Sequence, residues 1–235
     1  MVFDSIQALT LGETLYASRK RLPPEKLLFC SNLDGTTKDL SRYGGSCSFS
    51  NGTYKDAGYV AATDAGASYA KMAYGNPLTL NVHLGKSLNM QQSWSVEIRI
   101  NNALMIGENI SGGNIFGITA GEFSYTSRRG FPGDFGIQRN GSYLVYGGVV
   151  GAGMGHVAMV YDHTTGKIYG YTQGNMSCRV AVDVSGALAV SSLSAFVHLG
   201  SCFGQIRVIQ GLINAGSLTT SYPVPTELWT GYEAI

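Results

Sequence analysis

The residues best able to do chemistry stand close together between Gly155 and Gly174, in the stretch GHVAMVYDHTTGKIYGYTQG. His156, Asp162 and His163 are of the types that serve as general bases, proton relays and metal ligands. In an extended strand His156 and Asp162 would share a face but lie roughly 20 Å apart. Asp162 and Gly166 favour a tight turn, which would hold His163 in solvent. We therefore predict a β-hairpin in which His156 is structural, with no shared catalytic or metal site.

Two pairs of aspartates and a glycine-rich stretch suggest other ligands, but their spacing does not fit them. Asp34 and Asp39, with Asp56 and Asp64, offer oxygen atoms to calcium, which takes about six to eight of them. Their spacing fits no EF-hand, and aspartate before glycine more often forms a turn. The stretch GVVGAGMG contains a G-x-G-x-G pattern, but the helix that a phosphate-binding loop requires does not follow it. We expect no metal site and no cofactor.

The composition limits the classes of function. Charged residues make up 13% of the chain and the formal net charge is +1, so no basic field is available to attract nucleic acid or an anionic membrane. No window approaches the roughly 18 consecutive apolar residues of a membrane span, and the N-terminus lacks the apolar run of a signal peptide. We expect a protein made soluble in the cytoplasm, with no nucleic-acid partner and no membrane partner.

Cysteine and asparagine usage agree with that compartment. No C-x-x-C pair occurs, and a reducing compartment disfavours disulfides, so we predict buried free thiols at Cys30, Cys47, Cys178 and Cys202. Sequons for glycosylation stand at Asn51, Asn109, Asn140 and Asn175. Without a secretion signal they are more simply turns that are rich in asparagine.

The two ends of the chain differ from the part between them. Asp4 to Arg21 predicts a short amphipathic helix, with an apolar face and a basic run before the prolines at Pro23 and Pro24. In the C-terminal stretch SYPVPTELWTGYEAI the prolines predict an extended conformation, and the stretch carries large apolar side chains. We predict an N-terminal arm (1–26), one domain (27–213) and an extended tail (214–235). The residues expected to mediate assembly are Ile6, Leu9, Arg19, Lys20, Arg21, Trp229 and Tyr232. The alternative for the arm is a partly ordered tail.

From Leu27 onward the hydrophobic period is two. In SWSVEIRINN, Trp94, Val96, Ile98 and Ile100 alternate with polar residues, so we predict a half-buried strand with Glu97 facing solvent. Similar strands recur about every 8 to 12 residues, separated by turn-forming residues such as the 32 glycines. This pattern predicts an all-β fold, an antiparallel sandwich or barrel.

A contact surface is predicted in FSYTSRRGFPGDF, between Phe123 and Phe135, because arginine and aromatic residues anchor interfaces and stack on sugar rings. The partner or glycan contacts expected there and on the next strand are Tyr125, Arg128, Arg129, Phe131, Tyr143 and Tyr146. The alternative is a loop that folds on its own aromatic side chains.

Four segments, in order, resemble the concanavalin A-like jelly roll of the laminin G-like type. They are LLFCSNLDGTTKDLSRYGGS (27–46), SWSVEIRI (93–100), the hairpin stretch at 155–174 and VHLGSCFGQIRVI (197–209). Together they cover roughly residues 27 to 213. The resemblance implies an antiparallel two-sheet jelly-roll sandwich, a fold that hosts lectins, glycosidases, adhesion modules and virion proteins.

Departures from the functional patterns of that fold narrow the function. A glucanase of this type places carboxylates as E-x-D-x-x-E on one strand, whereas Glu97 is followed by Ile98, Arg99 and Ile100. We therefore expect no catalytic residue and no enzyme. The resemblance and the composition favour a bacteriophage virion protein, such as a capsid decoration, head-fibre or tail component, that partners other virion proteins and itself. Host-cell glycans are further candidate partners, and the alternative function is a carbohydrate-binding lectin module.

Overall fold

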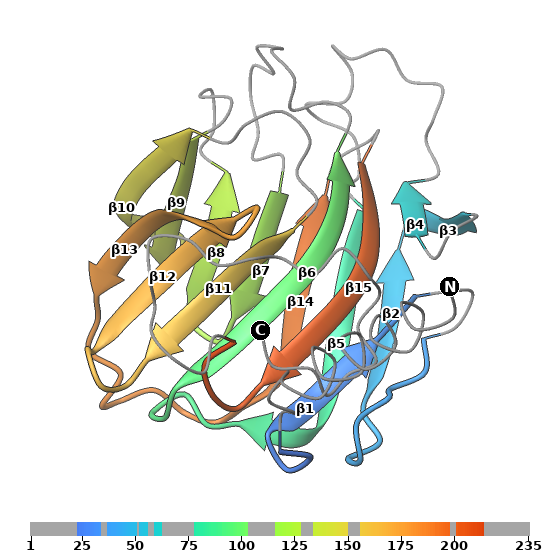
Figure 1. The fold of residues 1–235 in the computed structure, drawn as a ribbon, viewed down its shortest axis with the longest axis horizontal. Helices are drawn as coiled ribbons and strands as arrows, with labels where there is room; N and C mark the ends of the chain where they lie inside the picture. Colours follow the sequence, from blue (N-terminus) through green and yellow to red (C-terminus); the bar gives the residue numbers. More distant parts are fainter. Residues whose placement is uncertain are drawn as a thin grey trace, which may run out of the picture.

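The computed structural model describes residues 23–33, 37–50, 52–55, 59–62, 78–102, 116–127, 134–149, 156–197 and 201–213. Regular structure within these ranges is entirely β (Figure 1). The strands are β1 (Leu27–Ser31), β2 (Ser46–Ser50), β3 (Gly52–Lys55), β4 (Tyr59–Ala62), β5 (Leu78–Leu88), β6 (Trp94–Asn102), β7 (Phe116–Ala120), β8 (Phe123–Ser127), β9 (Asp134–Arg139), β10 (Ser142–Val149), β11 (Val157–Asp162), β12 (Lys167–Thr172), β13 (Asn175–Ala181), β14 (Val190–Val197) and β15 (Ser201–Ile209).

These strands form two antiparallel sheets that pack face to face. The eight-stranded sheet has the order β13-β12-β11-β6-β15-β4-β3, and β1 also pairs with β15. The seven-stranded sheet has the order β10-β9-β8-β7-β14-β5-β2 and lies behind the first sheet in Figure 1. The predicted fold class, an all-β two-sheet sandwich of jelly-roll-like form, is confirmed.

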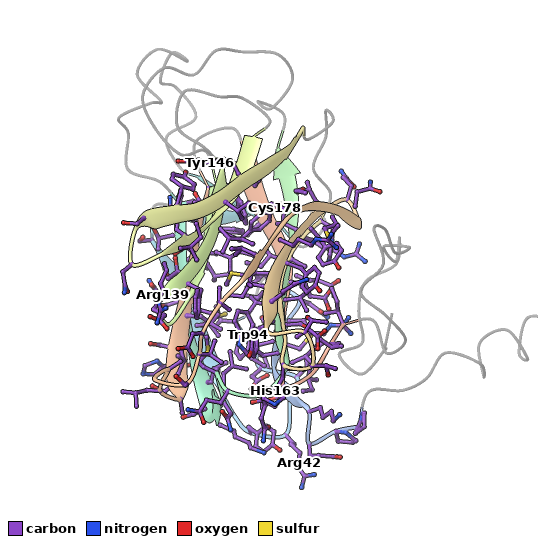
Figure 2. All side chains as sticks on the ribbon, turned by 90° about the vertical axis from the view of Figure 1, so that its left-hand side faces the viewer. Arg42, Trp94, Arg139, Tyr146, His163 and Cys178 are labelled. Atoms are coloured by element: carbon purple, nitrogen blue, oxygen red, sulfur yellow. The ribbon has the colours of Figure 1, made fainter. Side chains whose placement is uncertain are left out.

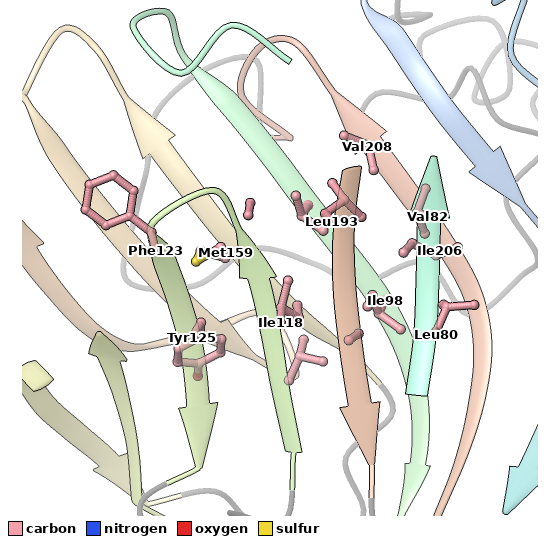
Figure 3. Close-up of a cluster of buried hydrophobic side chains, with 14 of the residues drawn as sticks. Leu80, Val82, Ile98, Ile118, Phe123, Tyr125, Met159, Leu193, Ile206 and Val208 are labelled. Carbon is pink, nitrogen blue, oxygen red and sulfur yellow. The ribbon is translucent and has the colours of Figure 1, made fainter. Parts of the chain in front are cut away.

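The main core lies between the two sheets (Figure 3). Ile98 of β6 and Ile206 of β15 enter this core from one sheet and Leu80 and Val82 of β5 from the other, and all four side chains are buried. Fully burying a large aliphatic or aromatic side chain stabilises the fold by roughly 1.5–3 kcal/mol. A second apolar cluster lies on the outer face of the eight-stranded sheet and consists of Leu27, Cys30, Ala158, Val160, Tyr169, Tyr171, Ile209 and Ile213.

Local sequence explains the hairpins. Asn140 and Gly141 both adopt positive φ angles, 50° and 80°, and join β9 to β10. Such turns match the twist of the flanking strands and favour Asn-Gly pairs, so the sequon at Asn140 is a hairpin turn. The predicted hairpin at 155–174 is confirmed as β11 and β12, with Asp162 paired to Lys167.

The predicted solvent-facing position of Glu97 is wrong. Its side chain is fully buried, because β6 lies between β11 and β15 and Glu97 pairs with Ala158 on one side and Arg207 on the other. Ser95 on the same face is also fully buried. Alternation correctly placed Trp94, Val96 and Ile98 in the core, but it does not show what covers the opposite face of a central strand.

The predictions for the two ends of the chain are not tested by the residues that the structure describes. The residues expected to mediate assembly, Ile6, Leu9, Arg19, Lys20, Arg21, Trp229 and Tyr232, lie outside the described residues. The division into arm, domain and tail therefore stays a prediction. No helix with the length and hydropathy of a membrane span occurs in the part of the chain that the structure describes.

Candidate ligand-binding groove

The hairpin residues that could do chemistry are separated by the fold. The His156 ring is fully buried and its Nε2 lies 3.0 Å from Oε2 of Glu97. The carboxylate of Asp162 instead accepts hydrogen bonds from the backbone N–H of Thr164 and the hydroxyl of Thr165, and so closes the turn. His163 is exposed in that turn. His156 and Asp162 thus lie at opposite ends of β11, as predicted, and the His156 ring is buried.

Glu97, His156 and Arg207 form a buried charged cluster on the outer face of the eight-stranded sheet. Arg207 Nε donates to Glu97 Oε1 at 2.5 Å, and the side chains of all three residues are fully buried. Burial raises the pKa of the Glu97 carboxyl, but the charge of Arg207 and the bond with His156 outweigh it, so the pKa lies below its ordinary value. The Glu97 carboxylate is therefore ionised and occupied by two partners, which suits a structural role.

The outer face of the seven-stranded sheet presents a continuous row of uncharged polar side chains. Cross-strand pairing aligns one residue from each of six neighbouring strands at the same level, and Tyr143 of β10 ends the row. In order from β2 to β9 the row is Ser48, Asn81, Ser194, Thr119, Ser124 and Gln138. Their core-facing neighbours, such as Val82 and Leu193, are buried. The row therefore lies on the outer side of a half-buried sheet, where Gln138 is buried and the other five residues are exposed or partly exposed.

A groove of about 840 Å³ lies over the β2, β5, β14 and β7 part of this row. It includes a second polar level, in which His83 pairs with Ser46 on one side and Ser192 on the other. Its lining residues are Ser46, Cys47, Ser48, Asn81, Val82, His83, Thr119, Gly121, Ala189, Val190, Ser191, Ser192, Leu193 and Ser194. We call this the polar groove. Hydroxyl and amide groups both donate and accept hydrogen bonds, so it suits a ligand rich in hydroxyl groups.

An aromatic ring borders the polar groove on the same face. Phe196 follows Ser194 by two residues on β14 and pairs with Gly117 of β7. The half-buried ring lies over Gly117, where a Cβ would stand 2.4 Å from Cε1 of Phe196. Only glycine at residue 117 leaves room for the ring to lie over the sheet. An aromatic face beside polar groups is the arrangement that binds the apolar face of a sugar ring.

Two of the tyrosines predicted as contacts lie on this same outer face. A Cβ on Gly136 would meet the Tyr143 ring at 2.6 Å, and the Tyr143 and Tyr146 rings are 4.6 Å apart. A bulge at Leu144 lets both tyrosines point outward while Val145 packs on the core. Tyr146 is 48% exposed and projects from the edge of the sheet in Figure 2.

The remaining predicted contacts do not join them. Tyr125 is fully buried between the sheets, where its hydroxyl lies 2.8 Å from Oγ1 of Thr172 on the opposite sheet. Its predicted contact role is therefore wrong, because β8 turns this position toward the core. Arg128, Arg129 and Phe131 lie outside the described residues.

Asp39, considered as a calcium ligand, is held by local hydrogen bonds. Its carboxylate accepts hydrogen bonds from the backbone N–H groups of Cys30, Ser41 and Gly45.

The thiols of Cys30, Cys47 and Cys178 are buried and free, as predicted, and Figure 2 shows Cys178 between the sheets. In the part of the chain that is described, no group of three or more His, Cys, Asp or Glu residues could hold a metal ion.

The polar groove was not predicted from the sequence. Its signal was present in the alternating serines of SCSFS (46–50) and SSLSAFV (191–197), which mark polar strand faces. Alternation alone does not reveal that these two strands flank β5, because pairing between distant segments is a tertiary property.

Comparison with known proteins supports the fold alone. No family profile matches the sequence, and no curated protein sequence matches it. Solved structures that match include the binding domain of botulinum neurotoxin DC bound to rat synaptotagmin II, at 12% identity and a TM-score of 0.57. The serotype D binding domain matches at 10% identity with a TM-score of 0.58. Each match covers 80% of this chain and 49% of the other.

A third similar structure belongs to botulinum neurotoxin type C, which depends on two ganglioside molecules to enter cells. It is 11% identical with a TM-score of 0.53, and the match covers 80% of this chain and 48% of the other. This chain thus shares its sandwich fold with these neurotoxin structures. It spans about half the length of those domains, so the likeness does not place their ligands on the matched half.

Proposed function

We propose that this protein is a non-enzymatic binding module that takes a glycan into the polar groove. The observation that carries the proposal is the row Ser48–Asn81–Ser194–Thr119, which offers hydroxyl and amide groups at one level across four neighbouring strands. Phe196 at its border supplies an aromatic surface for a sugar ring. A sugar presents many uncharged hydroxyl groups together with an apolar ring face, so it matches both features of the groove.

A binding role is favoured over hydrolysis by the chemistry of the groove. Glycoside hydrolysis uses a pair of carboxylates beside the scissile bond, and the described lining of the polar groove contains neither Asp nor Glu. The buried carboxylate of Glu97 belongs to the other sheet and is held by Arg207 and His156. The fold shared with receptor-binding domains is consistent with binding.

We further propose that the module works on a virion, as a laminin G-like capsid decoration, head-fibre or tail protein of a bacteriophage that attaches to host-surface glycans. The order of the four motifs supports the laminin G-like type. The low charge and the apolar residues predicted in arm and tail suit a subunit that is made soluble in the cytoplasm and assembles with itself and other virion proteins. Deleting residues 1–22 should abolish incorporation into particles while the sandwich stays folded; normal incorporation would contradict the assembly role.

The glycan function is tested with Asn81→Ala. Asn81 is exposed in the centre of the polar groove, so its loss should weaken binding on a glycan array and in titration calorimetry without unfolding the protein. Removing one hydrogen-bonding group costs about 0.5–1.5 kcal/mol, which corresponds to roughly a two- to thirteenfold loss in affinity. Asn175→Ala is the matched control, because Asn175 is exposed on β13 of the other sheet. A wild-type protein that binds no glycan, or equal losses in both variants, would overturn the proposal.

A further inference from the structure

We infer that the polar groove selects neutral glycans over acidic ones. This inference rests on the proposed function, because it names the ligand class of the same groove. Its basis is the charge of the described lining, which contains hydroxyl groups, the Asn81 amide and the His83 imidazole but no Asp, Glu, Lys or Arg. Such groups can replace the hydrogen bonds that sugar hydroxyls make to water.

An acidic sugar would leave water without a compensating charge in this groove. A carboxylate that loses its hydration without a cationic partner has an unfavourable desolvation free energy, and hydrogen bonds from uncharged donors offset only part of it. At the β7 end of the groove, Gly121 is followed by Glu122, whose carboxylate already accepts from Arg139 at 2.7 Å. That pair adds no free cation for a ligand.

Lys38 is the cation that strand pairing places at the β2 margin. It forms an isolated bridge with Ser46, so it lies beside the level of His83 and Ser192, and it is exposed. An ammonium group in open water is screened by salt and strongly hydrated, so its attraction for an acid is small. Lys38 can therefore hold an acidic ligand weakly at the margin but does not change the ligand class of the groove.

The geometry indicates how a neutral glycan chain would lie. Neighbouring strands are spaced at about 4.8 Å, so the four strands under the groove span about 14 Å across their direction. Along that line each strand presents a polar side chain at the same level, from Ser48 on β2 to Thr119 on β7. A linear oligosaccharide lying across the strands meets a hydrogen-bonding group at each step, with the Phe196 ring alongside.

The test compares the full chain with pairs of oligosaccharides of equal length, neutral in one member and carrying a sialic or uronic acid in the other, by titration calorimetry at pH 7.5 and physiological salt. Neutral ligands are expected to bind at least about tenfold more tightly. The variant Ser192→Lys introduces a cation into the groove and should raise affinity for the acidic member by about tenfold, whereas Ser142→Lys, exposed on β10 outside the groove, should not.

The outcomes separate the two proposals. If acidic ligands bind as tightly as neutral ones and Asn81→Ala weakens both, the glycan function stands and the selectivity is overturned. The selectivity is also overturned if Lys38→Ala abolishes tight acidic binding, because the margin rather than the groove then determines the ligand. If wild type binds neither member of any pair, the proposed function itself fails.

Discussion

The ring of Phe196 lies over Gly117 of the neighbouring strand, so close that a Cβ on residue 117 would stand 2.4 Å from the Cε1 atom of the ring. The two residues pair directly across β14 and β7, on the face that carries the polar groove. A methyl group at residue 117 must push the ring away from the sheet, since a contact this short is sterically excluded. The position of the Phe196 ring therefore depends on residue 117 being glycine.

Gly117→Ala should weaken glycan binding by displacing the Phe196 ring. We expect a loss of roughly three- to tenfold in affinity, comparable with losing one aromatic contact. Titration calorimetry measures the loss and a thermal melt checks the fold. Gly186→Ala is the control, because a Cβ there meets nothing within 4 Å. Unchanged affinity in a folded Gly117→Ala variant would show that the ring does not contact the ligand.

The buried pair Glu97 and Arg207 should behave as one unit in unfolding experiments. Glu97→Gln leaves a buried guanidinium without its carboxylate, which typically costs about 3–5 kcal/mol. Arg207→Met leaves the carboxylate with only His156 and should cost a similar amount. The double variant should be destabilised by clearly less than the sum, as measured by urea unfolding. Strictly additive costs would mean that the two side chains do not stabilise one another.

Acid should destabilise the protein through Glu97. Its pKa is lowered in the folded state, so the carboxylate contributes stability above the pKa of the unfolded chain, about 4.3. That stability is lost as pH falls through the lower folded pKa. The free energy of unfolding, measured from pH 7 to pH 2, should therefore decline below about pH 4 with a slope that Glu97→Gln reduces.

Asp183 provides the comparison for that titration. The backbone N–H of Ser185 lowers the pKa of Asp183, but this carboxyl is exposed. Asp183→Asn should change the slope much less than Glu97→Gln, because solvent screens an exposed group. Equal effects would exclude the buried cluster as the main source of acid sensitivity.

The thiols of Cys47 and Cys178 should resist alkylation in the folded protein. Burial raises the pKa of Cys47 to about 11 and that of Cys178 to about 12, so almost no reactive thiolate is present at pH 8. Iodoacetamide followed by peptide mass spectrometry should find both thiols unmodified until urea is added. The variant Ser48→Cys places an exposed thiol next to Cys47, on the groove face, and should be labelled rapidly. Protection of that thiol by a bound glycan would place the ligand in the groove; rapid labelling of Cys47 would contradict its burial.

Tyr125→Phe should destabilise the fold without changing binding. The variant removes the hydrogen bond between Tyr125 and Thr172 across the core and should cost about 1 kcal/mol in the free energy of unfolding. Tyr146→Phe, at an exposed position, should cost almost nothing. A binding defect in Tyr125→Phe with unchanged stability would restore the contact role that the sequence pattern predicted for this tyrosine.

Several features could be predicted from local pattern. Alternation placed Trp94, Val96 and Ile98 in the core, and Asp162 with Gly166 correctly indicated the hairpin turn between β11 and β12.

The predicted exposure of Glu97 and the predicted contact role of Tyr125 were wrong for related reasons. A polar residue on an alternating strand is usually exposed, but Glu97 faces a buried arginine that follows it by 110 residues. Tyr125 was assigned to a loop surface, whereas its strand ends only at Ser127 and turns its ring inward.

The sequence by itself determined the strand period, the turn positions and the all-β class, because these depend on interactions between residues a few positions apart. Only the tertiary structure decided which polar faces lie together. Ser48, Asn81 and Ser194 become neighbours through pairing of β2, β5 and β14, which are far apart along the chain. Backbone hydrogen bonds between strands are nearly the same for any sequence, so the choice of partners comes from burying both sheets' apolar faces against each other. The polar groove forms where this strand pairing brings outward-facing polar side chains together.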